Sequence, residues 1–216
     1  MPPPEPLIDH AGLMSEAARM GCELSVAQAE QLVSYVALLA KWNQVHNLTA
    51  IRDPADMRVQ HLLDCLAVLA PLRQHLREAS ARVLDVGSGA GLPGVVLAVA
   101  APELQVTCVD AVAKKAAFVT QAAAELRLKN LRSEHARVEQ LRLPPFDVIT
   151  SRALGSLRDL VRLTRPLLKP GGVWMAMKGV RPADEIADLA QEAEVFHVEP
   201  LHIPSLHGER CLVWMR

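Results

Sequence analysis

The stretch RVLDVGSGAGLPG, residues 82–94, decides the fold class of this chain. It predicts a short apolar strand over 82–86, a turn rich in glycine, and a helix over 94–100. Glycine has no Cβ atom, so the backbone of such a turn can approach a ligand closely. The first N–H groups of the following helix, with its positive dipole end, face the same ligand. The stretch therefore predicts a binding crevice beyond the carboxyl end of the strand.

Two aspartates indicate which ligand the crevice binds. Gly89-x-Gly91-x-x-Gly94 also fits dinucleotide-binding proteins, and alone it is a weak signal. Asp85 ends the strand before the turn, where its carboxylate opposes a pyrophosphate but attracts S-adenosylmethionine, which carries net positive charge. Asp110 ends the next strand, 19 residues after Gly91, and is placed to accept hydrogen bonds from ribose hydroxyls. NAD would use such an acid too, so Asp110 predicts a ribose without choosing the cofactor.

Hydrophobic periodicity around this stretch predicts strands that alternate with helices. Strands are expected at 82–86, 105–110, 131–135, 146–150, 173–177, 195–203 and 211–215, and further helices at 113–128, 156–168 and 182–193. Such alternation predicts an α/β fold with a mostly parallel sheet and helices on both faces. The last two strands follow each other directly, which predicts a hairpin and one antiparallel strand in a seven-stranded sheet.

The first 72 residues are predicted to be helical, because nothing strand-like precedes residue 82. Ser25 and Gln28 fit a capping box ahead of apolar residues at helical spacing. Asp53-Pro54 marks another helix start, with Asp as the cap and Pro at the first position. We therefore expect a helical extension over 1–72, packed on a cofactor-binding domain over 73–216.

The composition narrows the class of protein. No apolar run reaches the about 18 residues that a membrane helix needs, and the N-terminus does not resemble a secretory signal. The four cysteines are scattered, with no C-x-x-C pair and no second ligand nearby, which predicts reduced thiols and no metal site. We expect a cytoplasmic protein without a membrane partner, and a monomer, because nothing in the sequence demands a dimer.

Charge is unevenly distributed along the chain, although the net charge is only −1. Residues 114–181 hold 14 bases and 5 acids, whereas the segments on either side are acidic. Such a concentration can form a phosphate-binding face. The alternative is that these side chains are solvated separately and form no common surface, because the sequence does not show that they share a face.

The tip of the fourth strand, FDVITSRA over 146–153, bears on the methyl acceptor. It lacks the (Asn/Asp)-Pro-Pro-aromatic tetrad that is common in transfer to exocyclic amines. Transfer to a pyrimidine C5 needs a cysteine nucleophile, and Cys108 lies within a strand away from this edge. A ring nitrogen with a free lone pair, such as guanine N7, loses no proton on methylation. Such an acceptor needs positioning and no general base.

Several motifs occur in order along the chain: KWN at 41–43, NLTA at 47–50, HLLD at 61–64, DVGSGAGLPG at 85–94 and SRA at 151–153. Together they resemble the bacterial 16S ribosomal RNA guanine-N7 methyltransferases, the glucose-inhibited division protein B family. The resemblance covers nearly the whole chain, including Lys178-Gly179 and Gly208-Glu209-Arg210. It implies a Rossmann-like class I methyltransferase fold and methylation of a guanine N7 in 16S ribosomal RNA, free or in a small-subunit precursor.

The resemblance also implies a set of site residues, with S-adenosylmethionine as cofactor. Gly87 and Leu92 contact the cofactor in the first turn, Asp110 takes the ribose, and Val138-Glu139 meets the adenine. Arg152 lies near both cofactor and RNA. The full cofactor set is Asp85, Gly87, Ser88, Gly89, Gly91, Leu92, Asp110, Val138, Glu139 and Arg152. The RNA-binding set is Arg152, Lys178 and Asn47, with Arg152 and Lys178 as positioning candidates and no catalytic base assigned.

Each of these roles has a structural alternative. Arg152 could pair with a carboxylate, Lys178 could sit in a surface ion pair, and Asn47 could cap a helix. His61 and Asp64 lie three apart on one helical face, which favours a hydrogen-bonded pair between domains over catalysis. Trp42 falls at helical spacing and is predicted to be in the core. Cys65 departs from the family pattern, in which many members have serine, and no functional change is expected from it.

Two other functions remain open at this point. A small-molecule methyltransferase would share the cofactor site but would have no use for the basic segment 114–181. A dinucleotide-binding oxidoreductase, or a nucleotide-binding module without catalysis, would share only the glycine pattern.

Overall fold

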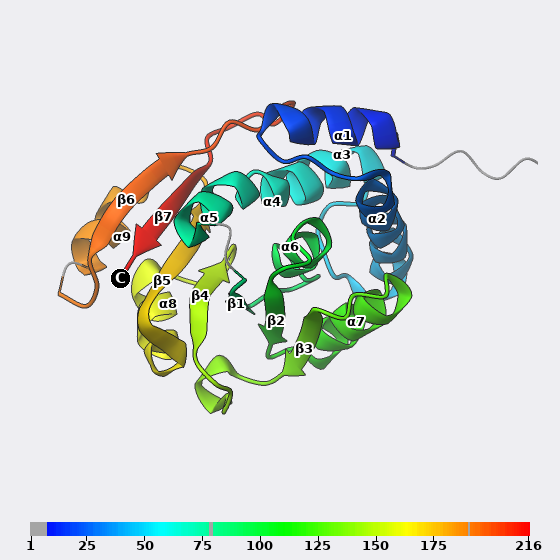
Figure 1. Ribbon diagram of the computed structural model, residues 1–216. Helices are drawn as coiled ribbons and strands as arrows, with labels where there is room; N and C mark the ends of the chain where they lie inside the picture. The colour runs from blue at the N-terminus through cyan, green and yellow to red at the C-terminus, as the bar shows by residue number, and fades with distance from the viewer. Residues whose placement is uncertain (1–7, 78–79, 190) are drawn as a thin grey trace, which may run out of the picture.

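The computed structural model describes residues 8–77, 80–189 and 191–216, so the predicted start of the extension at 1–7 lies outside the described residues. Within them, the strands form one seven-stranded sheet in the order β3-β2-β1-β4-β5-β7-β6 (Figure 1). The strands are β1 Arg82–Val86, β2 Gln105–Asp110, β3 Leu131–His135, β4 Phe146–Ser151, β5 Leu168–Lys178, β6 Val195–Pro200 and β7 Cys211–Met215.

The sheet is parallel except at β7, which runs antiparallel to both β5 and β6. This confirms the prediction of a mostly parallel α/β sheet with one antiparallel strand. Because β1 and β4 are parallel neighbours at the centre, with β2 beside β1 and β5 beside β4, their carboxyl ends meet along one edge. Ligands of open α/β sheets bind at such an edge, where the strand order reverses.

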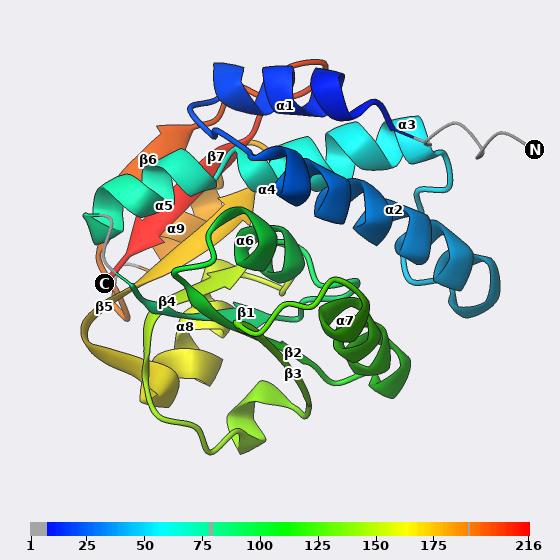
Figure 2. The ribbon, with the colours of Figure 1, turned by 45° about the vertical axis from the view of Figure 1, so that its right-hand side comes forward.

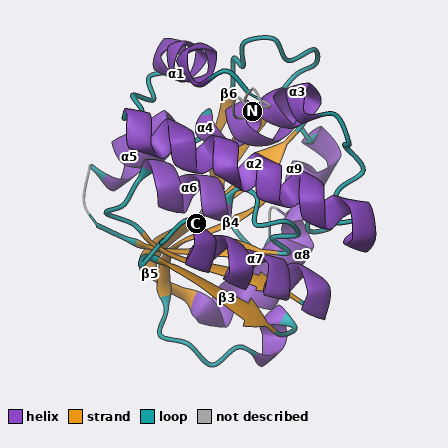
Figure 3. Ribbon diagram, turned by 90° about the vertical axis from the view of Figure 1, so that its right-hand side faces the viewer, coloured by secondary structure: helices purple, strands orange, loops and turns teal. Residues whose placement is uncertain are grey.

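Helices cover both faces of the sheet. Helices α6 (Gly94–Ala100) and α7 (Ala113–Glu125) share one face with the N-terminal helices, and Figure 3 shows α6 and α7 beside α2. Helices α8 (Leu157–Thr164) and α9 (Ala183–Leu189) contribute to the other hydrophobic cluster, and Figure 2 shows α8 across the sheet from α2 and α6. Neighbouring strand residues alternate between the two clusters, as expected when both faces are buried.

The N-terminal helices form one hydrophobic cluster with α6, α7 and one sheet face. They are α1 His10–Arg19, α2 Val26–His46, α3 Pro54–Met57, the π-helical η1 Arg58–Leu63, α4 Asp64–Leu66 and α5 Leu69–Leu76. Both predicted starts are confirmed, because Ser25 and Gln28 form a capping box and Asp53 caps α3 ahead of Pro54. The expected division at residue 72 falls within α5, and it stays a prediction.

Several element ends differ from the predicted ones. Helix α7 ends at Glu125, before the predicted 128, because Arg127 adopts a left-handed conformation at φ 56°. Strand β5 begins at Leu168, within the segment predicted as helix end and turn, because Leu168 pairs with Phe146 of β4. A short 3₁₀ turn, η3 Arg165–Leu167, separates α8 from β5.

The C-terminal elements are shorter than predicted. Helix α9 ends at Leu189, and the predicted helix over 182–193 passes residue 190, which lies outside the described residues. Strand β6 ends at Pro200 instead of residue 203. None of the described helices is both long enough and apolar enough to cross a lipid bilayer.

Candidate active site at the carboxyl edge of the sheet

The glycine turn between β1 and α6 is held against the end of β2. Gly87, Gly89 and Gly91 all have positive φ, at 65°, 59° and 86°, which explains the need for glycine. The N–H groups of Gly87 and Ser88 donate to the carbonyl oxygen of Val109, at 2.9 and 3.2 Å. A Cβ atom added to Gly89 would meet nothing within 4 Å, so the turn faces open space there.

Ser88 and Leu92 close the turn from within. The carbonyl oxygen of Ser88 accepts hydrogen bonds from the N–H groups of Gly91 and Leu92, at 2.8 and 2.9 Å. The side chains of Ser88 and Leu92 are both buried. The structure thus gives these two predicted residues a clear part in shaping the turn.

Asp110 joins the tip of β2 to the turn, beside the predicted crevice. Its Oδ2 atom accepts a hydrogen bond from the Gly89 N–H at 2.9 Å, and its Oδ1 atom accepts one from the Val112 N–H at 2.8 Å. The Lys115 ammonium lies 4.0 Å from Oδ2. The predicted ribose-binding carboxylate therefore lies against the open part of the turn.

Asp85 lies beneath the turn and is fully buried. Its Oδ2 atom accepts a hydrogen bond from the Gly94 N–H at 2.8 Å, while its Oδ1 atom has no hydrogen-bond partner. Burial raises the pKa of Asp85 to about 7, although the Gly94 hydrogen bond acts in the opposite direction. Asp85 can therefore act on a ligand through its charge, but it does not line the open edge as the sequence suggests.

Val138 and Glu139 follow β3 in a short 3₁₀ turn, η2 Val138–Gln140. Val138 is buried and Glu139 is exposed. The Ala136 N–H donates to the Asp110 carbonyl oxygen at 3.2 Å, which fixes this segment next to the end of β2. The structure thus brings Asp85, Asp110 and this segment to one edge of the sheet.

Tyr35 also contacts the glycine turn, and this contact was not predicted from the sequence. Its hydroxyl, carried by α2, donates a 2.6 Å hydrogen bond to the carbonyl oxygen of Ala90 in the glycine turn. The side chain is fully buried, and burial raises the pKa of Tyr35 well above its usual range. The only available signal was a phenol, the single tyrosine of the chain, within an apolar helical stripe.

Asp64 binds two arginines from the far part of the chain. Its Oδ2 atom lies 3.3 Å from Arg152 of the segment after β4, and its Oδ1 atom accepts from Arg210 Nε at 3.0 Å. Arg152 also donates to the Gln60 carbonyl oxygen at 3.0 Å. Asp64 is buried and both guanidinium groups are partly exposed. This cluster joins the N-terminal helices to β4 and β7. Such a link is expected if Asp64 and Arg152 have a structural role.

A cavity of about 370 Å³ adjoins this cluster, between the N-terminal helices and the carboxyl ends of β4 and β5. It is lined by Ile51, Gln60, His61, Asp64, Arg152, Ala153, Met177, Lys178, Gly179 and Arg210. We call it the acceptor cavity. The glycine turn is close to it, because a Cβ atom on Gly87 would lie 3.5 Å from Leu154, two residues after Arg152.

His61 is a weak base in this cavity. Burial, followed by the nearby Arg152 charge, lowers the pKa of His61 to about 4, so its ring is neutral at pH 7. Its Nε2 atom lies 2.9 Å from the Thr49 hydroxyl, and its Nδ1 atom lies 3.1 Å from the Gln60 carbonyl oxygen. His61 and Asp64 were expected to form a hydrogen-bonded pair, but no hydrogen bond joins these two described side chains. Each side chain binds other partners.

The remaining predicted residues have structural partners. Lys178 binds the Glu185 carboxylate at 2.8 and 3.0 Å, while it also lines the acceptor cavity. Asn47 is the exposed C-cap of α2, in the left-handed conformation. Trp42 is half-buried and packs edge-on against Phe118, with ring centroids 5.5 Å apart, so it lies at the margin of the core and not within it as predicted.

The bases of 114–181 do not all lie in one layer. Lys114 and Lys115 begin α7 on one side of the sheet, whereas Arg158 and Arg162 lie on α8 on the other side. Arg158 is bound to Glu192. The single phosphate-binding face suggested by the charge count is therefore divided between the two sides of the sheet.

Among the residues that the structure describes, no three His, Cys, Asp or Glu side chains are grouped to hold a metal ion. The four cysteines are free and buried.

The sheet order and the glycine turn at its carboxyl edge define the class as proteins with the Rossmann-like methyltransferase fold. TrmN from Thermus thermophilus has a TM-score of 0.56 and 23% identity, with 70% of this chain and 48% of that chain covered. The glycopeptide N-methyltransferase MtfA complexed with sinefungin has a TM-score of 0.56 and 14% identity, covering 68% and 84%. At these identities the likeness shows the fold alone.

The family is given by the sequence comparisons. The family model described as rRNA small subunit methyltransferase G, GidB, matches residues 28–213. A protein of Leptothrix cholodnii named ribosomal RNA small subunit methyltransferase G is 60% identical, covering 96% of this chain and 95% of its own. One of that name in Methylibium petroleiphilum is 56% identical, covering 94% and 92%. The chain belongs to the rRNA small subunit methyltransferase G family.

Proposed function

We propose that this chain transfers a methyl group from S-adenosylmethionine to N7 of a guanine in 16S ribosomal RNA, free or within a small-subunit precursor. The observation that carries the proposal is the pairing of two sites on one sheet edge. The glycine turn with Asp110 forms the first site, and the acceptor cavity with its arginines forms the second. The names of the relatives support the RNA substrate.

The residues of the turn fit the cofactor. Asp85 Oδ1 is a buried polar atom without a partner, and Gly89 faces open space. We assign the methionine part to the turn, the ribose to Asp110 and the adenine to Val138-Glu139. When bound, S-adenosylmethionine supplies an electrophilic methyl group on a positively charged sulfur. Asp85, buried in a medium of low dielectric constant, favours that charge once ionised.

The acceptor cavity suits a nucleobase that loses no proton when it is methylated. Asp64 is occupied by two arginines, Lys178 is bound to Glu185, and His61 has a pKa of about 4. None of these three groups is poised to remove a proton near pH 7. Guanine N7 carries a free lone pair, so it needs orientation by the cavity walls and no general base.

Arg152 and Lys178 are the residues that we assign to substrate orientation. Both line the acceptor cavity, and both carry N–H donors that can bind RNA oxygens. Asn47 is exposed at the end of α2, and we assign it a contact with RNA outside the cavity. The proposal includes a monomer that acts in the cytoplasm, with a helical extension over 1–72 and a catalytic domain over 73–216.

The test is methyl transfer to RNA from a strain that lacks this gene. The protein is incubated with tritium-labelled S-adenosylmethionine and either naked 16S RNA or small subunits. Labelled oligonucleotide fragments are then located in the RNA, and the nucleosides that they contain are identified by mass spectrometry. We expect label in 7-methylguanosine at a single position. Label in another nucleoside would overturn the guanine N7 assignment. Absence of label from both RNA substrates would overturn the RNA assignment and favour a small-molecule acceptor.

A further inference from the structure

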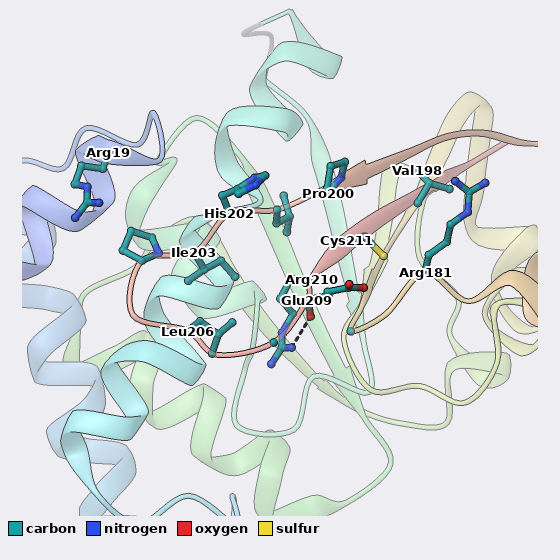
Figure 4. Close-up of a pocket in the computed structure, with 14 residues that line it drawn as sticks. Arg19, Arg181, Val198, Pro200, His202, Ile203, Leu206, Glu209, Arg210 and Cys211 are labelled. Carbon is teal, nitrogen blue, oxygen red and sulfur yellow. Dashed lines mark hydrogen bonds between the residues drawn. The ribbon is translucent and has the colours of Figure 1, made fainter.

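A second, larger cavity of about 710 Å³ lies outside the site described so far. It is bounded by the end of α1, the residues after β5, and the loop between β6 and β7 (Figure 4). We call it the flanking groove. In Figure 4, Arg19 lies to one side of the loop and Arg181 to the other, with Arg210 and Glu209 between them.

The flanking groove carries an excess of positive charge. Three arginines line it, against the single carboxylate of Glu209. Arg210 is held by Asp64, but Arg19 and Arg181 have no side-chain hydrogen bond or ion pair with any of the residues that the structure describes. Unpaired guanidinium groups present several N–H donors each and bind phosphate groups well.

The floor between these arginines is largely apolar. Val198, Leu201, Ile203 and Leu206 line it, and all four are half-buried. The aliphatic walls give the bases and sugars of a single strand an apolar contact surface, and the arginines at the margins are placed to bind its phosphates. A membrane surface or an acidic peptide would use the arginines but would not need such a recess for planar groups.

The flanking groove adjoins the acceptor cavity. Gly179 and Arg210 line both. A strand whose target guanine enters the acceptor cavity would therefore pass Arg210 and enter the groove. No residue of the groove other than Arg210 and Gly179 belongs to the acceptor cavity, so the two can be altered separately.

We propose that the flanking groove binds the single-stranded RNA next to the target guanine, with Arg19 and Arg181 on its phosphates. The proposal rests on the function proposed above and adds the surface that holds the RNA. It predicts that RNA affinity depends on two arginines that are far from the glycine turn in the sequence and do not contact it.

The test compares two double variants. Arg19→Gln with Arg181→Gln removes both charges from the groove. The matched control, Arg77→Gln with Arg127→Gln, removes two exposed charges that precede β1 and β3, at the opposite edge of the sheet. Binding of 16S RNA from the gene-deleted strain is measured from 50 to 200 mM salt, with S-adenosylmethionine affinity measured alongside.

We expect the groove variant to bind RNA about tenfold or more weakly than the control. The RNA association constant decreases with salt, so a plot of its logarithm against log salt concentration has a negative slope. That slope should be less steep by about 1.4 in the groove variant, because each lost contact with single-stranded phosphate contributes about 0.7. The affinity for S-adenosylmethionine should not change. Equal RNA affinity and equal salt slope in the two variants would overturn the groove assignment, while wild-type methylation of RNA would leave the proposed function standing.

A crosslink locates the RNA independently. Thiouridine placed beside the target guanine is irradiated on the wild-type protein, and the crosslinked peptide is identified by mass spectrometry. A crosslink to Arg19, within 179–181 or within 198–211 supports the proposal, since these residues line the groove, and one confined to other segments overturns it. Weaker binding of the groove variant to whole subunits, with unchanged binding to naked RNA, would assign the groove to a ribosomal protein instead.

Discussion

Asp110 has two functions at the tip of β2: it fixes the glycine turn and presents a carboxylate to the crevice. Replacing it with alanine removes both acceptor atoms. A hydrogen bond to a charged group contributes about 1.5 to 3 kcal/mol, so Asp110→Ala should weaken S-adenosylmethionine binding by about 10- to 100-fold. Calorimetric titration measures the affinity, and circular dichroism should show an intact fold.

The control for this variant is Asp147→Ala. Asp147 also accepts two hydrogen bonds, from the Arg82 N–H at 2.9 Å and from Lys169 at 2.8 Å, but it lies at the amino end of β4. Its loss should affect stability without changing cofactor affinity. Unaltered binding by Asp110→Ala would show that the ribose assignment is wrong.

Asp85 makes a pH-dependent prediction, because burial raises its pKa to about 7. Below that pKa the carboxyl is neutral, and a bound cation favours its ionised form and lowers the pKa. Binding then releases a proton, so affinity for S-adenosylmethionine should rise by about tenfold between about pH 5 and about pH 8 and level off above. Calorimetry at several pH values measures this.

Two controls isolate the charge of the sulfur. S-adenosylhomocysteine lacks the sulfonium, so its affinity should rise less over the same range. Asp85→Asn cannot ionise and should show no rise with either ligand. An equal rise for both ligands in the wild-type protein would disprove the interaction between Asp85 and the sulfonium.

At the scale of elements, helix α2 supports the cofactor turn from outside the sheet domain. Tyr35→Phe removes the hydrogen bond to Ala90 and leaves a buried carbonyl oxygen without a partner, which costs about 1 to 3 kcal/mol. We expect a lower melting temperature and a several-fold weaker affinity for S-adenosylmethionine. Thermal unfolding and calorimetry measure the two effects.

Thr164→Val is the matched control for Tyr35→Phe. The Thr164 hydroxyl is buried in α8, on the other face of the sheet, where it accepts from Trp174 Nε1 at 2.8 Å. Its removal should lower the melting temperature without weakening cofactor binding. If both variants lost stability and neither lost affinity, Tyr35 would have no role in positioning the turn.

Elements with local signals were predictable from the sequence. Strands β1, β2, β3 and β7 and helix α6 have the predicted bounds, because apolar runs and glycine stops are read over a few residues. The π-helical turn η1 was not predicted, because no local pattern distinguishes it from an α-helix. The early start of β5 was not predicted either, because it depends on Leu168 pairing with Phe146 of another strand.

At the scale of the whole molecule, the sheet order determines which parts of the chain meet. Asp64 binds Arg152 and Arg210, which lie 88 and 146 residues later, and the pairing follows only from the packing of the helices on β4, β5 and β7. The residues that we propose for the cofactor could be named from the sequence, since most of them surround one turn. The acceptor cavity could not be predicted in the same way, because its walls come from distant segments.

We propose that the crevice beyond β1 and β2 binds a sulfonium cofactor and no dinucleotide. Calorimetric titration of the wild-type protein with S-adenosylmethionine and with NAD, under identical conditions, tests it most directly. We expect binding of S-adenosylmethionine at one site per chain and no heat of binding with NAD. Binding of NAD without binding of S-adenosylmethionine would contradict it.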